Sequence, residues 1–286
     1  MRFVSVIIPV YNNQDTLERA ILSVLNDPFV SEILVVDDGS KDNSLIVSQK
    51  FANKEALIKV LYHPNRENKG ASASRNLGLA NAMSEWIQFL DADDELLKGK
   101  LGSQFDRINP GISFIVGNSI HVFPDGKRHY RKSDNKIWKG LIRSKLGDTC
   151  ANLWNKKYLL MVKGWNEELS SSQEYDLMFR LVLCNPYVSY EKSYLTLIHK
   201  TENSISSIKG GNTQRSKNWL ELRDKIREHL VRNRIFHLLN KYYWSGAVGI
   251  FCNQNQIDFP IHMDKWFYKL YEMEISIKIE IYKRLN

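Results

Sequence analysis

Residues 86–96 read WIQFLDADDEL. The mainly apolar first half is typical of a buried strand, and it runs directly into Asp91 and Asp93, two carboxylates one residue apart. A strand that ends in this way places both carboxylates at its C-terminal edge, where open α/β sheets bind their ligands. Clustered carboxylates repel one another unless a cation lies between them, and hard divalent cations prefer oxygen ligands. The alternative is an acidic turn that simply ends the strand.

The rest of the first hundred residues shows the same alternation of strand-like and helix-like patterns. Buried strands are expected at residues 4–10, 32–40, 57–62 and 86–90. Helices with an apolar face are expected between them, at residues 17–25, 44–54 and 71–83. This β-α-β-α order predicts an α/β fold, with a mainly parallel sheet flanked by helices on both faces.

The second part of the chain has a looser pattern. We expect strands at residues 112–118 and 119–123, helices at 154–162 and 174–183, and one or two strands at 187–197. Residues 204–213, which include Gly210-Gly211, are predicted to form a mobile loop. Long amphipathic stretches follow from residue 215, so the C-terminal region is predicted to be helical.

Composition limits the class of protein. The chain has 286 residues, of which 43% are hydrophobic and 25% are charged, as in ordinary globular proteins. No apolar run approaches the roughly 18 to 20 residues that a membrane-spanning helix needs. The N-terminus does not resemble a signal peptide, so we expect a cytoplasmic protein. Its three cysteines lack Cys-x-x-Cys spacing, which indicates neither a zinc site nor a disulfide framework.

The formal charge of +8 is concentrated in two segments. Residues 125–145 hold eight lysines and arginines against two aspartates, and residues 215–286 hold thirteen against eight acidic residues. Such segments favour anionic partners, which include nucleic acid, phosphate-bearing substrates and acidic membrane surfaces. The alternative for each segment is ordinary solvated charge.

Six short blocks occur in order along the chain: VSVIIPVYN (4–12), ILVVDDGS (33–40), GASASRN (70–76), FLDADD (89–94), GWNEEL (164–169) and QEYDL (173–177). Together they resemble the family 2 inverting glycosyltransferases of the GT-A fold over about residues 3–206. We therefore expect a catalytic domain at residues 1–213 and a helical extension at 214–286. The donor-binding half would end near residue 97, and the acceptor-binding half would follow at 98–213.

The resemblance implies a site for a nucleoside diphosphate sugar. Pro9 and Tyr11 would hold the nucleobase, with the Tyr11 ring stacked on it. Asp38 would accept a hydrogen bond from N3–H of uracil, which suits a UDP-sugar. Arg75 would face the diphosphate, because its planar fork can donate two hydrogen bonds at once. Asp91 would contact the ribose or the sugar. The alternatives are that Tyr11 is an ordinary aromatic residue in a turn, that Asp38 caps a helix and that Arg75 is a surface arginine.

The resemblance also implies a divalent cation, Mn²⁺ or Mg²⁺. Asp93 would bind it directly, while Asp94 is interpreted as structural. A site with one or two protein carboxylates is adequate, because substrate phosphates supply further ligands. His199 stands where related enzymes often have a histidine that faces the diphosphate or the metal. The alternative for His199 is a structural histidine without a ligand.

Glu174 is the candidate general base that deprotonates the acceptor hydroxyl. Many family members carry a Glu-Asp pair at this point, whereas this chain has Gln173-Glu174. Asp176 therefore stays open as a rival. A plain acidic residue at a helix start, favoured by the helix dipole, is the alternative to both.

The predicted function is metal-dependent, inverting transfer of a sugar to a cell-surface or lipid-linked glycan. The C-terminal helices could contact an acidic membrane surface, form a homodimer or cover the catalytic domain. One alternative function is a catalytically inactive GT-A domain that serves as partner of another transferase. A nucleic-acid-binding protein is the other, but no DNA or RNA motif supports it, so no nucleic acid partner is expected. No Gly-x-Gly-x-x-Gly turn or Walker-type loop is present either.

Overall fold

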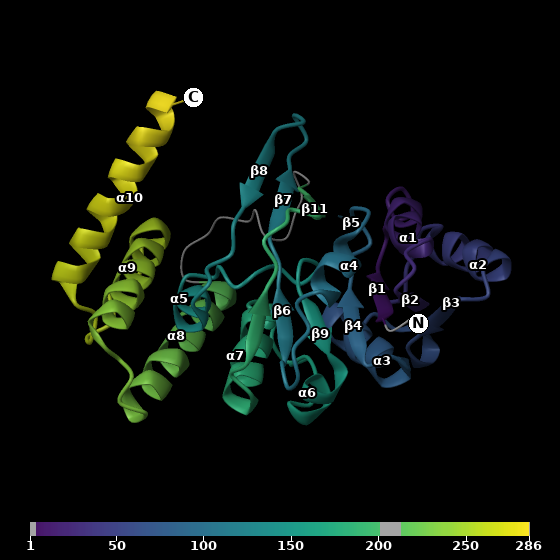
Figure 1. The fold of residues 1–286 in the computed structure, drawn as a ribbon, viewed down its shortest axis with the longest axis horizontal. Coiled ribbons are helices and arrows are strands. Elements are labelled where there is room, and N and C mark those ends of the chain that lie inside the picture. Colours follow the sequence, from purple (N-terminus) through teal and green to yellow (C-terminus); the bar gives the residue numbers. More distant parts are fainter. Residues whose placement is uncertain (1–3, 201–212, 286) are drawn as a thin grey trace. The chain divides into compact units, whose positions relative to one another are not determined.

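The computed structural model describes residues 4–200 and 213–285. It contains two compact units, each built from several stretches of the chain. The first is made of Met1–Ser133, Gly147–Glu168 and Asp176–Ser204, and the second of Asp134–Leu146, Leu169–Tyr175 and Ile205–Asn286. Most elements of both are labelled in Figure 1. Both sheets belong to the first unit, whereas the described part of the second is mainly helical.

The main sheet has seven strands in the order β10-β6-β9-β4-β1-β2-β3. Their bounds are β1 Val4–Val10, β2 Val30–Asp37, β3 Ile58–Tyr62, β4 Trp86–Phe89, β6 Phe114–Val116, β9 Leu153–Asn155 and β10 Val188–Tyr190. β1 pairs in parallel with β2 and β4, β2 with β3, and β10 with β6. β9 runs antiparallel between β4 and β6. The mainly parallel sheet is confirmed, and the C-terminal ends of β1, β2 and β4 meet at one edge.

Helices cover both faces of β1. Successive side chains of a strand point to opposite faces, so neighbouring residues of β1 contact different helices. Val6 and Ile8 belong to the core cluster that contains the apolar stripe of α1. Ile7 points the other way, toward Gly78 of α3, where a Cβ atom would overlap the Ile7 side chain. The helices of this unit are α1 Leu17–Leu25, α2 Ser44–Lys54, α3 Ala71–Asn81, α4 Lys100–Phe105, α6 Lys156–Met161 and most of α7 Gln173–Cys184, with a 3-10 turn at Pro64–Arg66.

A second sheet has four strands in the order β5-β11-β7-β8. It begins at the end of residues 91–96, which are called the acidic stretch below. Its strands are β5 Glu95–Leu96, β7 Ser119–Val122, β8 Arg128–Arg131 and β11 Thr196–His199. β11 runs antiparallel to β5, and Leu197 lies opposite Glu95. This pairing brings the end of β11 beside the acidic stretch, about a hundred residues away in the sequence. The register therefore decides where His199 lies.

The helix predicted at residues 154–162 is wrong at its beginning. Trp154 lies in strand β9, and the helix α6 starts at Lys156, where Asn155 caps it by accepting from the N–H of Lys157. Trp154 is fully buried and stacks on Phe114 at a ring distance of 5.3 Å. A short apolar run cannot be told from a buried helical turn by its periodicity, so tertiary packing decided the outcome.

The second unit contains α5 Ile137–Ile142, α8 Gln214–Arg232, α9 Leu238–Asn255 and α10 Lys265–Leu285. α9 and α10 pack closely, because Gly246 and Gly249 of α9 leave room for the rings of Tyr271 and Tyr268. The helical C-terminal region is thus confirmed. Among the residues that the structure describes, no helix is both long and apolar enough to cross a membrane. Residues 204–212 of the predicted loop lie outside the described residues.

Candidate functional site

The C-terminal edge of β1, β2 and β4 gathers most of the predicted donor-binding residues. Pro9 and Tyr11 lie at the end of β1, Asp38 follows β2, and Asp91 follows β4 by two positions. Tyr11 is 46% exposed and Pro9 is partly exposed. An exposed aromatic ring next to a proline offers an apolar surface of the kind on which a nucleobase can stack. The roles of these two residues in base binding stay predictions.

Asp38 has a structural role that the sequence analysis missed. One of its carboxylate oxygens accepts from the backbone N–H of Lys69 at 2.8 Å, and the other accepts from the N–H of Gly70 at 2.9 Å. The imidazole Nε2 of His63 is 3.5 Å from the same carboxylate. Asp38 is almost fully buried and fastens the loop before α3 to the end of β2. Recognition of uracil by this carboxylate stays a prediction.

The neighbouring Asp37, unlike Asp38, was not singled out from the sequence. Its side chain is 1% exposed, and its Oδ1 atom has no hydrogen-bond partner among the described residues. Buried polar atoms are nearly always hydrogen-bonded, so an unpaired carboxylate oxygen at a sheet edge is unusual. The Asp37-Asp38 pair at the end of a buried strand was the only sequence signal for it.

Arg75 and Asp91 are brought together. Nη2 of Arg75 donates to Oδ1 of Asp91 at 2.6 Å, and the guanidinium also lies over the ring of Trp165, with its central carbon 4.6 Å from the ring centroid. The Arg75 side chain is 9% exposed and that of Asp91 is 35% exposed. The charge of Arg75 is thus held in place at the sheet edge, where its acidic partner still contacts solvent. A charge-assisted contact of this kind can be shared with an incoming anion.

Asp94 is held inside the protein, in agreement with the structural role inferred from sequence. Its Oδ1 accepts from the backbone N–H of His199 at 3.0 Å, and its Oδ2 accepts from the Cys150 thiol at 3.3 Å. Burial and the nearby carboxylates of Asp91 and Asp93 raise the pKa of Asp94 well above its usual range. Burial likewise raises the pKa of the Cys150 thiol. The Cys150 thiol is therefore protonated near neutral pH.

Asp93, the predicted cation ligand, is partly buried, and its role in metal binding stays a prediction. Burial and the carboxylate of Asp91 raise the pKa of Asp93, while Lys200 and Arg19 act in the opposite direction. A bound cation would favour the ionised form of Asp93, because opposite charge stabilises it. Ligand atoms of Asp91, Asp94 and Cys150 lie within 4.8 Å of one another. The carboxylate oxygens of this group fit a hard divalent cation better than a soft one.

His199 joins this group through the second sheet. Its Nε2 atom is 2.7 Å from Oε1 of Glu95. Oε1 of Glu95 is in turn 3.2 Å from Nε of Arg19, and Nη2 of Arg19 donates to the backbone oxygen of Asp93 at 2.5 Å. The sequence analysis named His199 but missed Arg19 and Glu95. Metal binding by His199 stays a prediction.

The two candidate bases differ in their surroundings. Asp176 of α7 is 9% exposed and forms an ion pair with Arg180 at 2.8 Å. Arg180 also donates to the backbone oxygens of Val162 and Gly164, both at 2.7 Å. Asp176 is therefore committed to packing the first unit. Glu174 belongs to the second unit and is only partly buried. The role of Glu174 as base stays a prediction, with Asp176 as the paired alternative.

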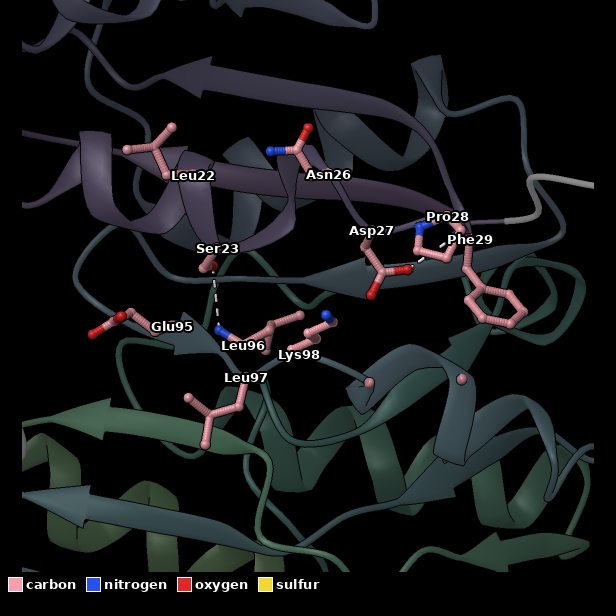
Figure 2. Close-up of a pocket in the computed structure, with 12 residues that line it drawn as sticks. Leu22, Ser23, Asn26, Asp27, Pro28, Phe29, Glu95, Leu96, Leu97 and Lys98 are labelled. Atoms are coloured by element: carbon pink, nitrogen blue, oxygen red, sulfur yellow. Dashed lines mark hydrogen bonds between the residues drawn. The ribbon is translucent and has the colours of Figure 1, made fainter.

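A cavity of about 580 Å³ lies beside β5 (Figure 2). It is lined by the end of α1, by Pro28 and Phe29, and by residues 95–99. None of the predicted donor-binding residues lines it. Figure 2 shows Ser23 of α1 facing Leu96. The Ser23 hydroxyl accepts a hydrogen bond from the backbone N–H of Leu96 at 3.3 Å.

Comparison with known proteins agrees with this picture. The family model described as Glycosyl transferase family 2 matches residues 5–163. A beta-1,3-glucosyltransferase of Campylobacter jejuni that acts on GalNAc(5)-diNAcBac-PP-undecaprenol is 32% identical over 59% of this chain and 56% of its own length. The Escherichia coli protein WfgD, a UDP-Glc:alpha-D-GlcNAc-diphosphoundecaprenol beta-1,3-glucosyltransferase, is 29% identical over 83% of this chain and 91% of its own. The chain spans about half the length of several other curated relatives.

Solved structures show the same fold. Staphylococcus aureus TarS 1-349 with UDP-GlcNAc superimposes with a TM-score of 0.63 at 20% identity, over 89% of this chain and 82% of that one. A mannosyltransferase of Pyrobaculum calidifontis with GDP-Man and Mn²⁺ gives 0.61 at 13% identity, over 98% and 81%. Identities this low show the fold alone. The GT-A fold that the sequence predicted is confirmed.

Proposed function

Because the chain belongs to glycosyl transferase family 2, we propose that it transfers a sugar from a nucleoside diphosphate sugar to a hydroxyl of a glycan acceptor. The observation that carries the proposal is the group at the sheet edge. Arg75 pairs there with Asp91, two residues before Asp93, so positive charge for a diphosphate and carboxylate oxygens for a cation occur together. The family assignment made from the sequence blocks is thereby confirmed.

The proposed donor is a UDP-sugar. Asp38, which follows β2, is the carboxylate expected to accept from N3–H of uracil, and Tyr11 is the exposed ring expected to stack on the base. Two similar proteins support this choice, since WfgD is named for UDP-Glc and TarS was crystallised with UDP-GlcNAc. The archaeal neighbour with GDP-Man makes GDP-sugars the first donors to test if UDP-sugars fail.

The proposed acceptor is a glycan linked to a lipid diphosphate. The two glucosyltransferases compared above are named for an undecaprenol-linked acceptor. Residues 125–145 contribute an excess of positive charge to the acceptor half, which suits a phosphate-bearing acceptor. The proposed place of action is therefore the cytoplasmic face of a membrane. Membrane contact or dimer formation by the C-terminal helices stays a prediction.

The proposed reaction is a single displacement that inverts the anomeric carbon. Glu174 takes the proton from the acceptor hydroxyl as the oxygen attacks, and the bond from the anomeric carbon to the diphosphate breaks in the same step. A general base of this kind typically contributes about 10²- to 10⁴-fold to the rate. Its replacement should therefore reduce turnover without preventing donor binding.

The leaving diphosphate needs its charge neutralised. Arg75 supplies a fixed guanidinium, held by Asp91 and Trp165 before any ligand arrives, so little reorganisation is needed. Asp93, with Asp91 beside it, would hold Mn²⁺ or Mg²⁺, and such a cation stabilises the departing phosphate oxygens when it is bound. Oxygen donors accept either ion.

The proposal is tested by following transfer of labelled glucose or N-acetylglucosamine from UDP to a polyprenyl-diphosphate-linked GlcNAc. Glu174→Gln should lower kcat by about 10²-fold or more and leave the affinity for UDP within twofold of the wild type. The matched variant Asp176→Asn, which alters a paired helix residue, should retain transfer once its fold is verified. A wild-type protein that binds no nucleoside diphosphate and transfers no sugar would support the inactive-domain alternative instead.

A further inference from the structure

Arg19 connects helix α1 to the acidic stretch at a point where the metal-binding residues are expected. Its Nη2 atom donates to the backbone oxygen of Asp93 at 2.5 Å, and its Nε atom lies 3.2 Å from Glu95. The side chains of Arg19 and Glu95 are 39% and 25% exposed. An ordinary surface ion pair would leave the backbone untouched, whereas this arginine also fixes the peptide that carries Asp93.

Glu95 extends the connection to β11. The same oxygen atom that faces Arg19, Oε1, lies 2.7 Å from Nε2 of His199. The backbone N–H of His199 donates to Asp94. His199 is thus held both through its ring and through its backbone N–H. When Nε2 donates its proton to a carboxylate, Nδ1 carries the lone pair, which is the usual arrangement for a histidine that binds metal.

A second contact follows one turn later on the same helix. Ser23, four residues after Arg19, accepts from the backbone N–H of Leu96 at 3.3 Å, as Figure 2 shows. Residues four apart share one helix face. This face of α1 therefore holds the acidic stretch at two successive turns, through Arg19 and through Ser23.

The opposite face of the sheet supplies a matching contact. Arg75 extends from α3 and pairs with Asp91, whereas Arg19 extends from α1 and holds the peptide of Asp93. α1 and α3 lie on opposite faces of β1. The acidic stretch is therefore held between two arginines before a cation arrives. Their charges also offset part of the repulsion between its carboxylates.

We propose that Arg19 and Glu95 are positioning residues for the divalent cation of the donor site. Arg19 fixes the peptide of Asp93, and Glu95 fixes the tautomer and the ring orientation of His199. The inference rests on the proposed function, because it assumes that Asp93 and His199 face the cation that accompanies the donor. Carboxylates and arginines one step removed from the metal typically change metal affinity by about 10- to 100-fold when they are replaced.

The test measures Mn²⁺ affinity in the presence of UDP, from the electron paramagnetic resonance signal of unbound Mn²⁺. Arg19→Ala and Glu95→Ala should weaken Mn²⁺ binding by about 10-fold or more. Arg19→Lys and Glu95→Gln should lie between these variants and the wild type, because each keeps one hydrogen bond. Arg107→Ala and Glu18→Gln, which replace exposed residues of matching type, should bind as the wild type does.

A second readout separates positioning from general loss of structure. In the metal-free protein, ¹⁵N chemical shifts should show His199 protonated at Nε2, and Glu95→Ala should give a mixture of the two tautomers at an unchanged unfolding midpoint. If the wild type binds Mn²⁺ with UDP and both alanine variants bind it equally well, the inference is overturned while the proposed function stands. If the wild type binds no Mn²⁺ with UDP, the proposed function fails and the inference fails with it.

Discussion

Two buried arginines, one in each unit, are held in different ways. Arg75 of the first unit is 7% exposed and pairs with the carboxylate of Asp91, which solvent still reaches. Arg223 of the second unit is fully buried, and neutral groups satisfy it. A guanidinium beside a solvent-accessible carboxylate can meet an incoming anion. A guanidinium whose hydrogen bonds go to backbone oxygens and a hydroxyl, and which lies on a ring, serves the packing of its own unit.

The surroundings of Arg223 show why it is structural. Its Nε atom donates to the backbone oxygen of Ile142 at 3.3 Å, and its Nη2 atom donates to the hydroxyl of Ser144. Its central carbon lies 4.0 Å from the ring centroid of Trp219. Burial lowers the pKa of Arg223 to about 9, although Tyr175 and Glu174 act in the opposite direction. The cation therefore remains charged at neutral pH while it joins α5 to α8.

The largest effect is expected when Arg75 of the first unit is replaced. Arg75→Ala removes a fixed positive charge from the diphosphate site, so kcat/KM for the UDP-sugar should fall by about 10²- to 10³-fold. The free energy of unfolding should fall less than in Arg223→Ala, because Asp91 remains partly solvated when its partner is removed. Transfer kinetics and thermal unfolding measure the two quantities. A loss of kcat/KM no larger than that of Arg107→Ala would remove Arg75 from the site.

The next largest effect is expected when Arg223 of the second unit is replaced. Arg223→Ala should lower the free energy of unfolding by about 2 to 5 kcal/mol, because a large buried side chain is lost and its hydrogen-bond acceptors are left unpaired. Arg223→Met keeps more of the volume and should cost less. Urea denaturation gives both values. Arg232→Ala, an exposed position on the same helix, is the control, and equal stability of the two alanine variants would refute the structural role.

A smaller effect is expected for Asp148, a carboxylate of the first unit that is paired for a structural purpose. Burial alone would raise the pKa of Asp148, but the charge of Arg131 and hydrogen bonds from His121 and Ser119 outweigh it and lower the pKa to about 2. The folded pKa thus lies below the unfolded one. The ionised carboxylate stabilises the fold above about pH 4, and this contribution is lost as the pH falls toward 2.

The advantage in unfolding free energy of the wild type over Asp148→Asn should therefore shrink by about 2 kcal/mol between pH 5 and pH 2. Chemical denaturation at a series of pH values measures it. A difference that stays constant over this range would mean that the pKa of Asp148 is not lowered in the folded protein.

The sequence predicted those parts of the molecule whose signals are local. Buried parallel strands such as β1 and β2 are continuous apolar runs that end in polar turns, and the acidic pair after β4 marks the sheet edge. The helical C-terminal region followed from long amphipathic patterns. Trp154 was misassigned, because its apolar neighbourhood fits a strand or a buried helical turn equally well.

The missed parts depend on tertiary pairing. Arg19 looks like any polar residue on a helix, and its contact with Asp93 joins residues 74 positions apart. Glu95 was part of the first stretch considered, yet its partner His199 is 104 positions away and reaches it only through the pairing of β5 with β11. Arg223 carries no sequence signal of burial, because α8 is rich in charged residues.

The central claim is that the sheet edge around Asp93 binds a nucleoside diphosphate together with a divalent cation. The most direct test is calorimetric titration of UDP into the wild type and Asp93→Ala, each with and without Mn²⁺, with Asp106→Asn as an exposed control. The account predicts that Mn²⁺ strengthens UDP binding by about 10-fold or more in the wild type and the control, and not in Asp93→Ala. Equal, metal-independent affinities in all three proteins would contradict it.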